Sequence, residues 1–124
     1  MMCMVIMAVP SFARASDQIR DYTINVTTSS GWIDVEFIVT GKGIMSSLGC
    51  QSIYVYEKVG NGWSLEDYLL EDDDGMSETN SARHASFISL PAENGVEYKV
   101  IITIFADDGI ARDSRSRTVF ITGE

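Results

Sequence analysis

The feature of this sequence that most constrains its fold is an apolar period of two residues, which recurs from residue 21 to the C-terminus. Apolar side chains alternate first at Tyr22, Ile24 and Val26, and then at Ile33, Val35, Phe37 and Val39. Such alternation is typical of a half-buried β-strand, because an amphipathic helix would repeat every three or four residues. The sequence therefore predicts strands and no helical stretch.

Glycine-rich segments divide this pattern into about seven strands. A turn at residues 29–31 separates the first two, and Gly41-Lys42-Gly43 is expected to end the second before a loose loop at 46–49. The third strand runs from Cys50 to Lys58 and its partner from Trp63 to Leu70. Asn61-Gly62 between them favours a tight hairpin, since both residues accept positive φ angles. Gly60 beside this turn leaves the hairpin register open. Further strands are expected at residues 85–90, 96–106 and 117–122.

The strand count predicts the fold class. Seven short strands in about 100 residues are typical of a two-sheet sandwich. The 45% hydrophobic content is enough for one core without disulfide or metal. We therefore expect residues 16–124 to form a single antiparallel β-sandwich domain. The strand at 96–106 is apolar on both faces, so we place it in the centre of a sheet.

The N-terminal segment predicts export. Residues 1–9 are almost wholly apolar, Pro10 interrupts them, and Ala13-Arg14-Ala15 forms a small-x-small ending. This is typical of a signal peptide cleaved near Ala15, although a positively charged n-region is missing and the true start lies further upstream on this interpretation. A buried N-terminal strand or tail is the alternative. The run is too short for a spanning helix, so we expect a secreted or cell-surface protein without membrane insertion.

The charge balance excludes two classes of partner. The chain has 18 acidic and 9 basic side chains, with a formal charge of -9 and no basic cluster. This is the wrong sign for a phosphate backbone or an anionic lipid surface. We therefore expect no nucleic-acid binding, and we expect a monomer.

One segment carries a family resemblance. Residues 90–102, with Leu90-Pro91 leading through Gly95 to Tyr98-Lys99-Val100, resemble the connection between strands E and F of fibronectin type III domains. The resemblance implies an immunoglobulin-like sandwich in which Tyr98 is a corner tyrosine and Leu90 a core residue. The hairpin at residues 50–63 resembles small secreted proteins of Gram-positive bacteria. Both resemblances concern the fold and imply no activity.

Aromatic residues around this hairpin form the first candidate site. Tyr54 and Tyr56 share one face of the third strand, and Trp63 and Tyr68 come from its partner. An exposed row of rings would bind a protein or a glycan. The alternative is that half of these rings belong to the core. The leading hypothesis is a non-enzymatic extracellular binding or structural module.

An acidic segment at residues 71–78 forms the second candidate site. Its carboxylates suit calcium, with Asp72, Asp73, Asp74 and Glu78 as candidate ligands. It does not match the EF-hand template, and a solvated surface loop is the alternative. Calcium is the one cofactor that the sequence suggests.

Catalysis has little support in the sequence. His84 is the single histidine, and no glycine-flanked nucleophile or orienting carboxylate accompanies it. One histidine and one cysteine after cleavage are too few for a typical zinc site. Cys50 would then either be buried as a small apolar side chain or pair between two chains.

Overall fold

A computed structural model describes residues 18–124, which form a six-stranded antiparallel sheet. The strands are β2 (Ile19–Ser29), β3 (Trp32–Val59), β4 (Gly62–Leu70), β5 (Ser77–Pro91), β6 (Glu97–Asp107) and β7 (Arg112–Thr122). Among these residues there is no helix long and apolar enough to cross a membrane. The predicted signal peptide at residues 1–15 lies outside the described part of the chain.

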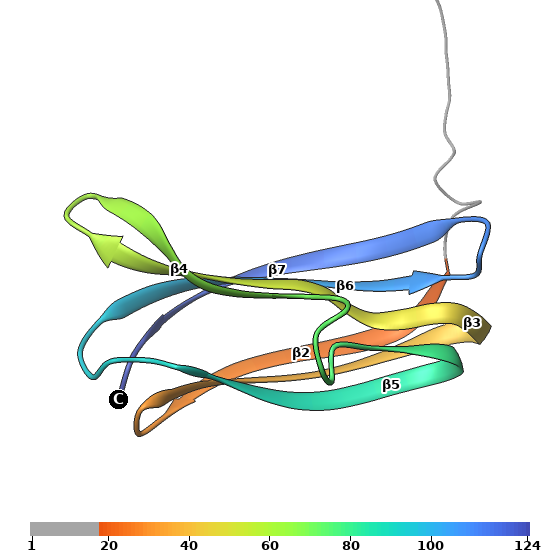
Figure 1. Cartoon of the computed structure of the whole chain (residues 1–124), viewed down its shortest axis with the longest axis horizontal. Helices are drawn as coiled ribbons and strands as arrows, with labels where there is room; N and C mark the ends of the chain where they lie inside the picture. Colours follow the sequence, from red (N-terminus) through yellow and green to blue (C-terminus); the bar gives the residue numbers. More distant parts are fainter. Residues whose placement is uncertain (1–17) are drawn as a thin grey trace, which may run out of the picture.

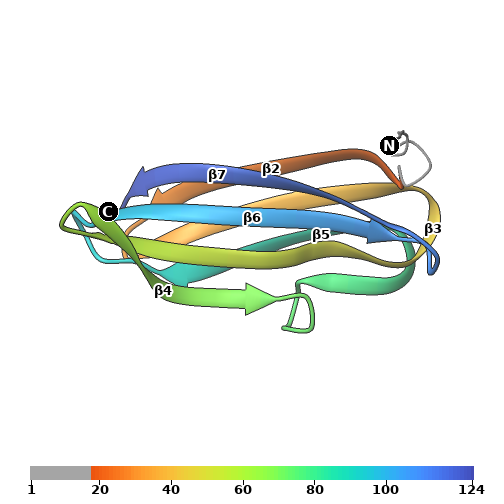
Figure 2. The same ribbon diagram turned by 90° about the horizontal axis from the view of Figure 1, so that it is seen from above.

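The long strand β3 organises the whole sheet. Along one edge it pairs first with β2 and then with β6, and along the other edge first with β5 and then with β4, while β7 pairs with β6. The sheet therefore curls into a half-barrel with two arms that face each other (Figures 1 and 2). The first arm contains β2, β5 and the start of β3. The second arm contains β4, β6, β7 and the end of β3.

The continuity of β3 corrects one expectation. The sequence predicted a strand end at Gly41-Lys42-Gly43 and a loose loop at residues 46–49, but β3 runs on for 28 residues. The irregularity is confined to a register shift between Thr40 and Met45, where Ile44 is 77% exposed. A β-bulge absorbs extra residues without ending the ladder. Two predicted strands are thus one, and six strands replace the expected seven.

Gly49 lies where β3 passes from one set of partners to the next. Its φ is +143°, and a Cβ built on it would lie 2.3 Å from the carbonyl oxygen of Met76 and 2.7 Å from the Cα of Ser77. The N–H of Cys50 donates to the same Met76 carbonyl at 2.7 Å. Only glycine allows this close backbone approach.

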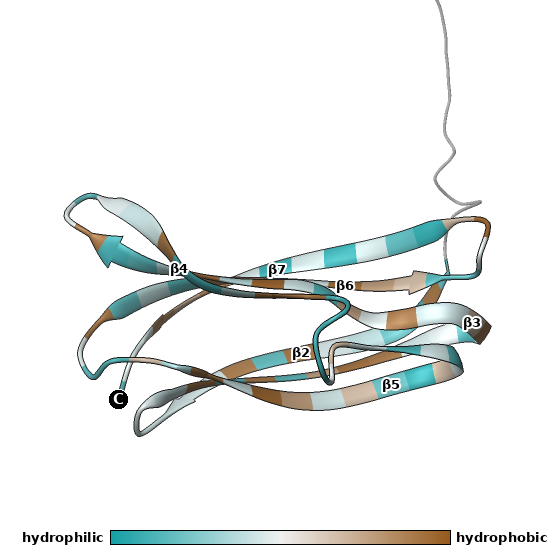
Figure 3. Ribbon diagram, in the orientation of Figure 1, coloured by the Kyte–Doolittle hydropathy of each residue, from teal (hydrophilic) through white to brown (hydrophobic). Residues whose placement is uncertain are grey.

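The core lies between the two arms. The inward side chains of β3 and β6 are fully or almost fully buried, among them Ile33, Val35, Phe37, Ile53, Val55, Val100, Ile102 and Ile104. Figure 3 shows that β7 carries mainly hydrophilic residues, whereas β6 beside it is mainly hydrophobic. This agrees with the predicted central position of that strand.

The acidic segment is shorter than expected and contributes to the core. The sequence predicted an acidic segment at residues 71–78, with a solvated surface loop as the alternative to a calcium site, and a strand only from residue 85. In the structure β5 already begins at Ser77, and Met76 is fully buried. One apolar side chain among acidic neighbours was enough to anchor the connection, because burying a methionine contributes about 1.5–3 kcal/mol.

The two sides of the half-barrel close differently. Between β2 and β7, Asp113 Oδ2 accepts hydrogen bonds from the backbone N–H groups of Gln18 at 3.1 Å and Ile19 at 3.3 Å. Arg117 Nη1 donates to the carbonyl of Ile24 at 2.7 Å. We call this junction the β2–β7 seam. On the opposite side, β4 and β5 each pair with β3 and with no other described strand.

The predicted hairpin between β3 and β4 is confirmed, but its turn is placed one residue earlier. Val59 pairs with Gly62, so the two loop residues are Gly60 and Asn61. Gly60 has a φ of +61°, whereas Asn61 has no positive φ. A positive φ at the first loop position alone is typical of a type II′ turn, which requires glycine there. The turn therefore uses Gly60 where the sequence pointed to Asn61-Gly62.

The Tyr98 hydroxyl makes the bond that a corner tyrosine would make. It accepts a hydrogen bond from the N–H of Glu93 at 2.7 Å, five residues upstream, and the Tyr98 ring is buried. Leu90 is also buried in the core. Leu90 is thus a core residue, and the Tyr98 hydroxyl bonds back to the connection that precedes its strand.

We predict that Gly49→Ala will destabilise the protein by about 3 kcal/mol or more, because the methyl group would collide with the backbone of residues 76 and 77. The matched control is Gly43→Ala in the same strand, where a Cβ meets no atom within 4 Å. We expect this control to stay within about 1 kcal/mol of the wild type. Urea unfolding followed by far-UV circular dichroism measures both, and equal losses would contradict the assignment.

We predict that Tyr98→Phe will lower the free energy of unfolding by about 1–2 kcal/mol, because the N–H of Glu93 loses the acceptor of a partly buried hydrogen bond. Tyr22→Phe is the control, since the Tyr22 ring is substantially exposed. The same urea titrations apply. A Tyr98→Phe protein as stable as the control would show that the bond contributes nothing.

Candidate functional site

The four aromatic residues predicted from the sequence lie together on the outer face of the second arm. Tyr54 and Tyr68 are register partners with ring centroids 6.2 Å apart and planes inclined by 28°. The ring centroid of Trp63 lies 5.7 Å from that of Phe120 on β7. We call these four rings, together with Tyr56, the aromatic face. Tyr54, Tyr56 and Trp63 are half-buried on this face, and Tyr68 and Phe120 are exposed.

A bulge in β4 places Trp63 and Tyr68 on the same face. They are five residues apart, so a regular strand would point them to opposite faces. The register shifts between Val55 and Tyr56, where β3 opposes Asp67 and then Leu65 and leaves Glu66 as the extra residue. Bulges re-aim side chains in this way. The hairpin register that the sequence left open is thereby settled, with Lys58 opposite Trp63.

Two lysines make cation–π contacts with rings of the aromatic face. Lys99 Nζ lies 4.9 Å from the ring centroid of Tyr56 and 5.3 Å from that of Trp63, and Lys58 Nζ lies 5.9 Å from Trp63. Cation–π contacts of this kind hold a ring in one orientation and contribute about 0.5–1 kcal/mol each at exposed sites. These contacts restrict the orientation of Tyr56 and Trp63, while Tyr68 is 53% and Phe120 67% exposed.

Sequence reasoning missed Phe120 and Lys99. Both occupy outward positions of strands that were predicted, and they are register partners across β6 and β7. The signal was the alternation in residues 117–122, which places Phe120 on the face opposite Val119 and Ile121. The sequence pattern did not show that β7 would lie beside β6, or that β6 would pair with the end of β3.

The four candidate calcium ligands are not brought together. Asp73 Oδ2 accepts from the N–H of Leu70 at 2.7 Å, which stabilises the turn after β4. Glu78 Oε1 lies 3.1 Å from His84 Nδ1, and the carboxylates of Asp72 and Asp74 are exposed. Within residues 18–124 no group of three or more His, Cys, Asp or Glu is placed to hold a metal ion. The calcium hypothesis stays a prediction from the sequence.

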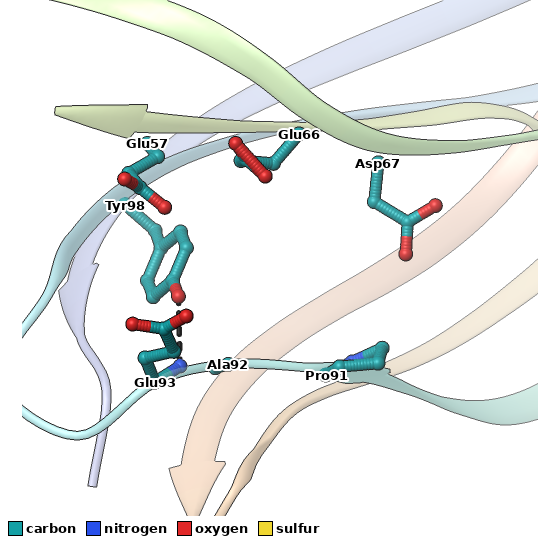
Figure 4. A pocket seen from close by; sticks show the side chains of 7 residues that line it. All are labelled: Glu57, Glu66, Asp67, Pro91, Ala92, Glu93 and Tyr98. Carbon is teal, nitrogen blue, oxygen red and sulfur yellow. Dashed lines mark hydrogen bonds between the residues drawn. The ribbon is translucent and has the colours of Figure 1, made fainter. Parts of the chain in front are cut away.

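A small acidic pocket lies between the two arms near Tyr98 (Figure 4). It has a volume of about 300 Å³ and is lined by Glu57 from β3, Glu66 and Asp67 from β4, Pro91 at the end of β5, the following Ala92 and Glu93, and Tyr98. The bulge residue Glu66 contributes to it. The Tyr98 hydroxyl is already bonded to the Glu93 N–H.

The single histidine has a structural environment. His84 Nε2 lies 2.8 Å from the carbonyl oxygen of Gly75, and Nδ1 faces Glu78. Its side chain is 12% exposed and packs against Phe37 at 5.7 Å between ring centroids. His84 is thus a largely buried residue that connects β5 to the preceding turn.

Cys50 is buried and free. Its Sγ lies 3.3 Å from the carbonyl oxygen of Ser52 and 3.4 Å from that of Thr103. Burial raises the pKa of the thiol to about 12, because the thiolate would lose its hydration. The first of the two alternatives, burial as a small apolar side chain, is confirmed.

Comparisons with known proteins yield distant structural likenesses. No family model and no curated protein sequence matches the chain. A hypothetical protein from Pyrococcus horikoshii aligns with a TM-score of 0.38 and 10% identity over 84% of this chain and 91% of its own. A superoxide reductase from Nanoarchaeum equitans aligns with a TM-score of 0.31 and 8% identity over 80% of this chain and 91% of its own. Both TM-scores are too low to transfer a fold or an activity.

We predict that Cys50 will be unreactive in the native protein. In a Cys3→Ser background, a thiol-reactive dye at pH 8 should label Cys50 on the order of 100-fold more slowly before unfolding in urea than after it, because the reactive thiolate forms only on opening. Non-reducing electrophoresis should show no dimer linked through Cys50. Similar labelling rates in the two states would contradict the burial.

Proposed function

We propose that this chain is an exported, non-enzymatic module of fibronectin type III-like architecture that binds an extracellular ligand through its aromatic face. The observation that carries the proposal is the convergence of five rings from β3, β4 and β7 on the outer face of the second arm, where Tyr68 and Phe120 are exposed. Small soluble domains rarely expose a contiguous apolar patch without using it.

The architectural part of the proposal is supported by two features. The two arms face each other across a shared core, as the sheets of a sandwich do. The Tyr98 hydroxyl bonds back to the connection that precedes its strand, which is the mark of a tyrosine corner. Export is supported by the apolar N-terminal residues and the Ala13-Arg14-Ala15 ending.

The rigidity of the aromatic face supports a binding role. Each ring touches another ring or a lysine, as in the pairs Tyr54–Tyr68 and Trp63–Phe120. Tyrosine and tryptophan supply large contact area at low entropic cost when their orientation is already fixed. A preorganised surface of this kind binds without first ordering its side chains.

The outer face of the first arm offers a contrast. Phe87 on β5 is 63% exposed, but it pairs with Glu36. Near it Asp34 accepts hydrogen bonds from the hydroxyls of Ser29 and Ser89. Those two bonds lower the pKa of Asp34. This arm has a mainly polar outer face, so the aromatic clustering belongs to the second arm.

The proposal that the module is non-enzymatic is supported by the environments of Cys50 and His84, the side chains best suited to act as a nucleophile and a base. Among residues 18–124, the Cys50 thiol is buried with a raised pKa, and both ring nitrogens of His84 face acceptors within its own fold. Neither side chain is presented to a substrate.

We predict that Phe120→Ala will reduce binding to purified Gram-positive cell walls about tenfold in a co-sedimentation assay, because truncating one ring that contacts the ligand removes about 1–2 kcal/mol of binding free energy. Tyr56→Ala should have a similar effect. The matched control is Phe87→Ala, an equally exposed phenylalanine on the other arm.

The outcome that contradicts the proposal is equal retention of Phe120→Ala and Phe87→Ala. Thermal unfolding of each variant, monitored by circular dichroism, verifies that the comparison is made between folded proteins.

A further inference from the structure

A polar groove adjoins the aromatic face at Tyr54. It has a volume of about 530 Å³, which lies within the range of small-ligand sites. Its lining includes Gln51, Ser52 and Tyr54 from β3, Glu71 and Asp72 from the β4–β5 connection, and Arg112 at the start of β7. The groove joins three segments that are far apart in the sequence.

The guanidinium group of Arg112 in this groove is held in one position. It lies 4.1 Å from the ring centroid of the buried Phe105. Nη1 and Nη2 form a fork with the Glu71 carboxylate at 2.8 and 3.3 Å, and Nε donates to Asp107 at 3.0 Å. The bonds to Glu71 raise the pKa of Arg112. Planar forks of this kind fix geometry as well as charge.

The groove has more acidic than basic side chains. Arg112 has Glu71 and Asp107 as ion-pair partners, and Asp72 adds a further negative charge to the groove. On the aromatic face Lys58 lies 3.5 Å from Glu97, and Lys99 lies between two rings. The groove and the face together therefore have four acidic side chains against three basic ones, and they offer no excess positive charge to an anion. An uncharged ligand fits this balance.

The groups in the groove suit a sugar. Gln51 Oε1 accepts from Arg112 Nη1 at 3.2 Å, which leaves the amide NH₂ to donate. The exposed carboxylate of Asp72 accepts. Ser52 is 8% exposed, and its hydroxyl borders the groove as a donor and an acceptor. Sugar hydroxyls are donors and acceptors at once, and their C–H faces pack on rings such as Tyr54. A protein anchor would instead call for an apolar pocket.

The groove and the rings form one continuous path. Tyr54 belongs to both, and from residue 52 to residue 58 the strand extends about 20 Å. A second hollow of about 380 Å³ adjoins Trp63 and Phe120 near the far end of the face. This length accommodates an extended chain of several sugar units.

We propose that the ligand of the aromatic face is a neutral oligosaccharide, and that the groove beside Tyr54 is the subsite that hydrogen-bonds one of its sugar units. This inference rests on the proposed function, because it assigns a ligand class to the same face. Gln51, Ser52 and Asp72 supply the polar contacts, and Arg112 positions Gln51.

The test is isothermal titration of the full chain with neutral hexasaccharides of glucose, mannose, xylose and N-acetylglucosamine, and with hexasaccharides of uronic acids as the anionic arm. We expect at least one neutral hexasaccharide to bind and the uronic acids to bind more weakly. Gln51→Ala and Asp72→Ala should each weaken that binding about 5- to 30-fold. The matched control is Asp74→Ala, which removes an equally exposed carboxylate that does not line the groove and should leave the affinity unchanged.

Several outcomes overturn the inference. If Asp72→Ala and Asp74→Ala bind the sugar with equal affinity, the groove is not part of the binding site. Tighter binding of uronic acids than of neutral hexasaccharides would contradict the charge argument. If no hexasaccharide binds at millimolar concentration while Phe120→Ala still loses cell-wall binding relative to Phe87→Ala, the sugar assignment fails and the binding module stands. If those two phenylalanine variants also bind alike, the proposed function fails with it.

Discussion

The whole architecture depends on one uninterrupted strand that changes both of its neighbours. Between residues 41 and 52, β3 leaves β2 and β5 and joins β6 and β4, and the close approach of Gly49 to the Met76 carbonyl marks this exchange. Because the ladder is never broken, a single strand contributes core side chains to both arms. The outer face of the second arm, and every candidate site on it, follows from this exchange.

Local sequence pattern was sufficient for the strands and insufficient for their partners. Alternation at residues 33–39 and 53–56 correctly separated inward from outward side chains, and Gly60-Asn61-Gly62 marked the hairpin. Gly41-Lys42-Gly43 was read as a break, since two glycines and a lysine are typical of a loop. Whether such a segment ends a strand or bulges within it depends on pairing with β5, which begins 36 residues further along the chain.

The aromatic face shows the same limit at the level of a site. Tyr54, Tyr56, Trp63 and Tyr68 were identified from the sequence, yet strict alternation would have divided Trp63 from Tyr68. The bulge at Glu66 reunites them, and a bulge depends on the register of two strands together. Phe120, Lys99 and the groove around Arg112 come from strands that meet only in the folded sheet. Their grouping is a property of topology, which a local pattern does not contain.

The β2–β7 seam has a mechanical consequence. Both strands run in the same direction along it, from the bonds of Asp113 with residues 18 and 19 to the bond between the Gly31 N–H and the Glu124 carbonyl. Residue 18 and the C-terminus therefore lie at opposite ends of the molecule (Figure 1). Tension applied between these ends would pull β2 and β7 past each other and load the seam in shear, so that its bonds share the force. A domain tethered at one end and loaded at the other would resist extension first at this seam.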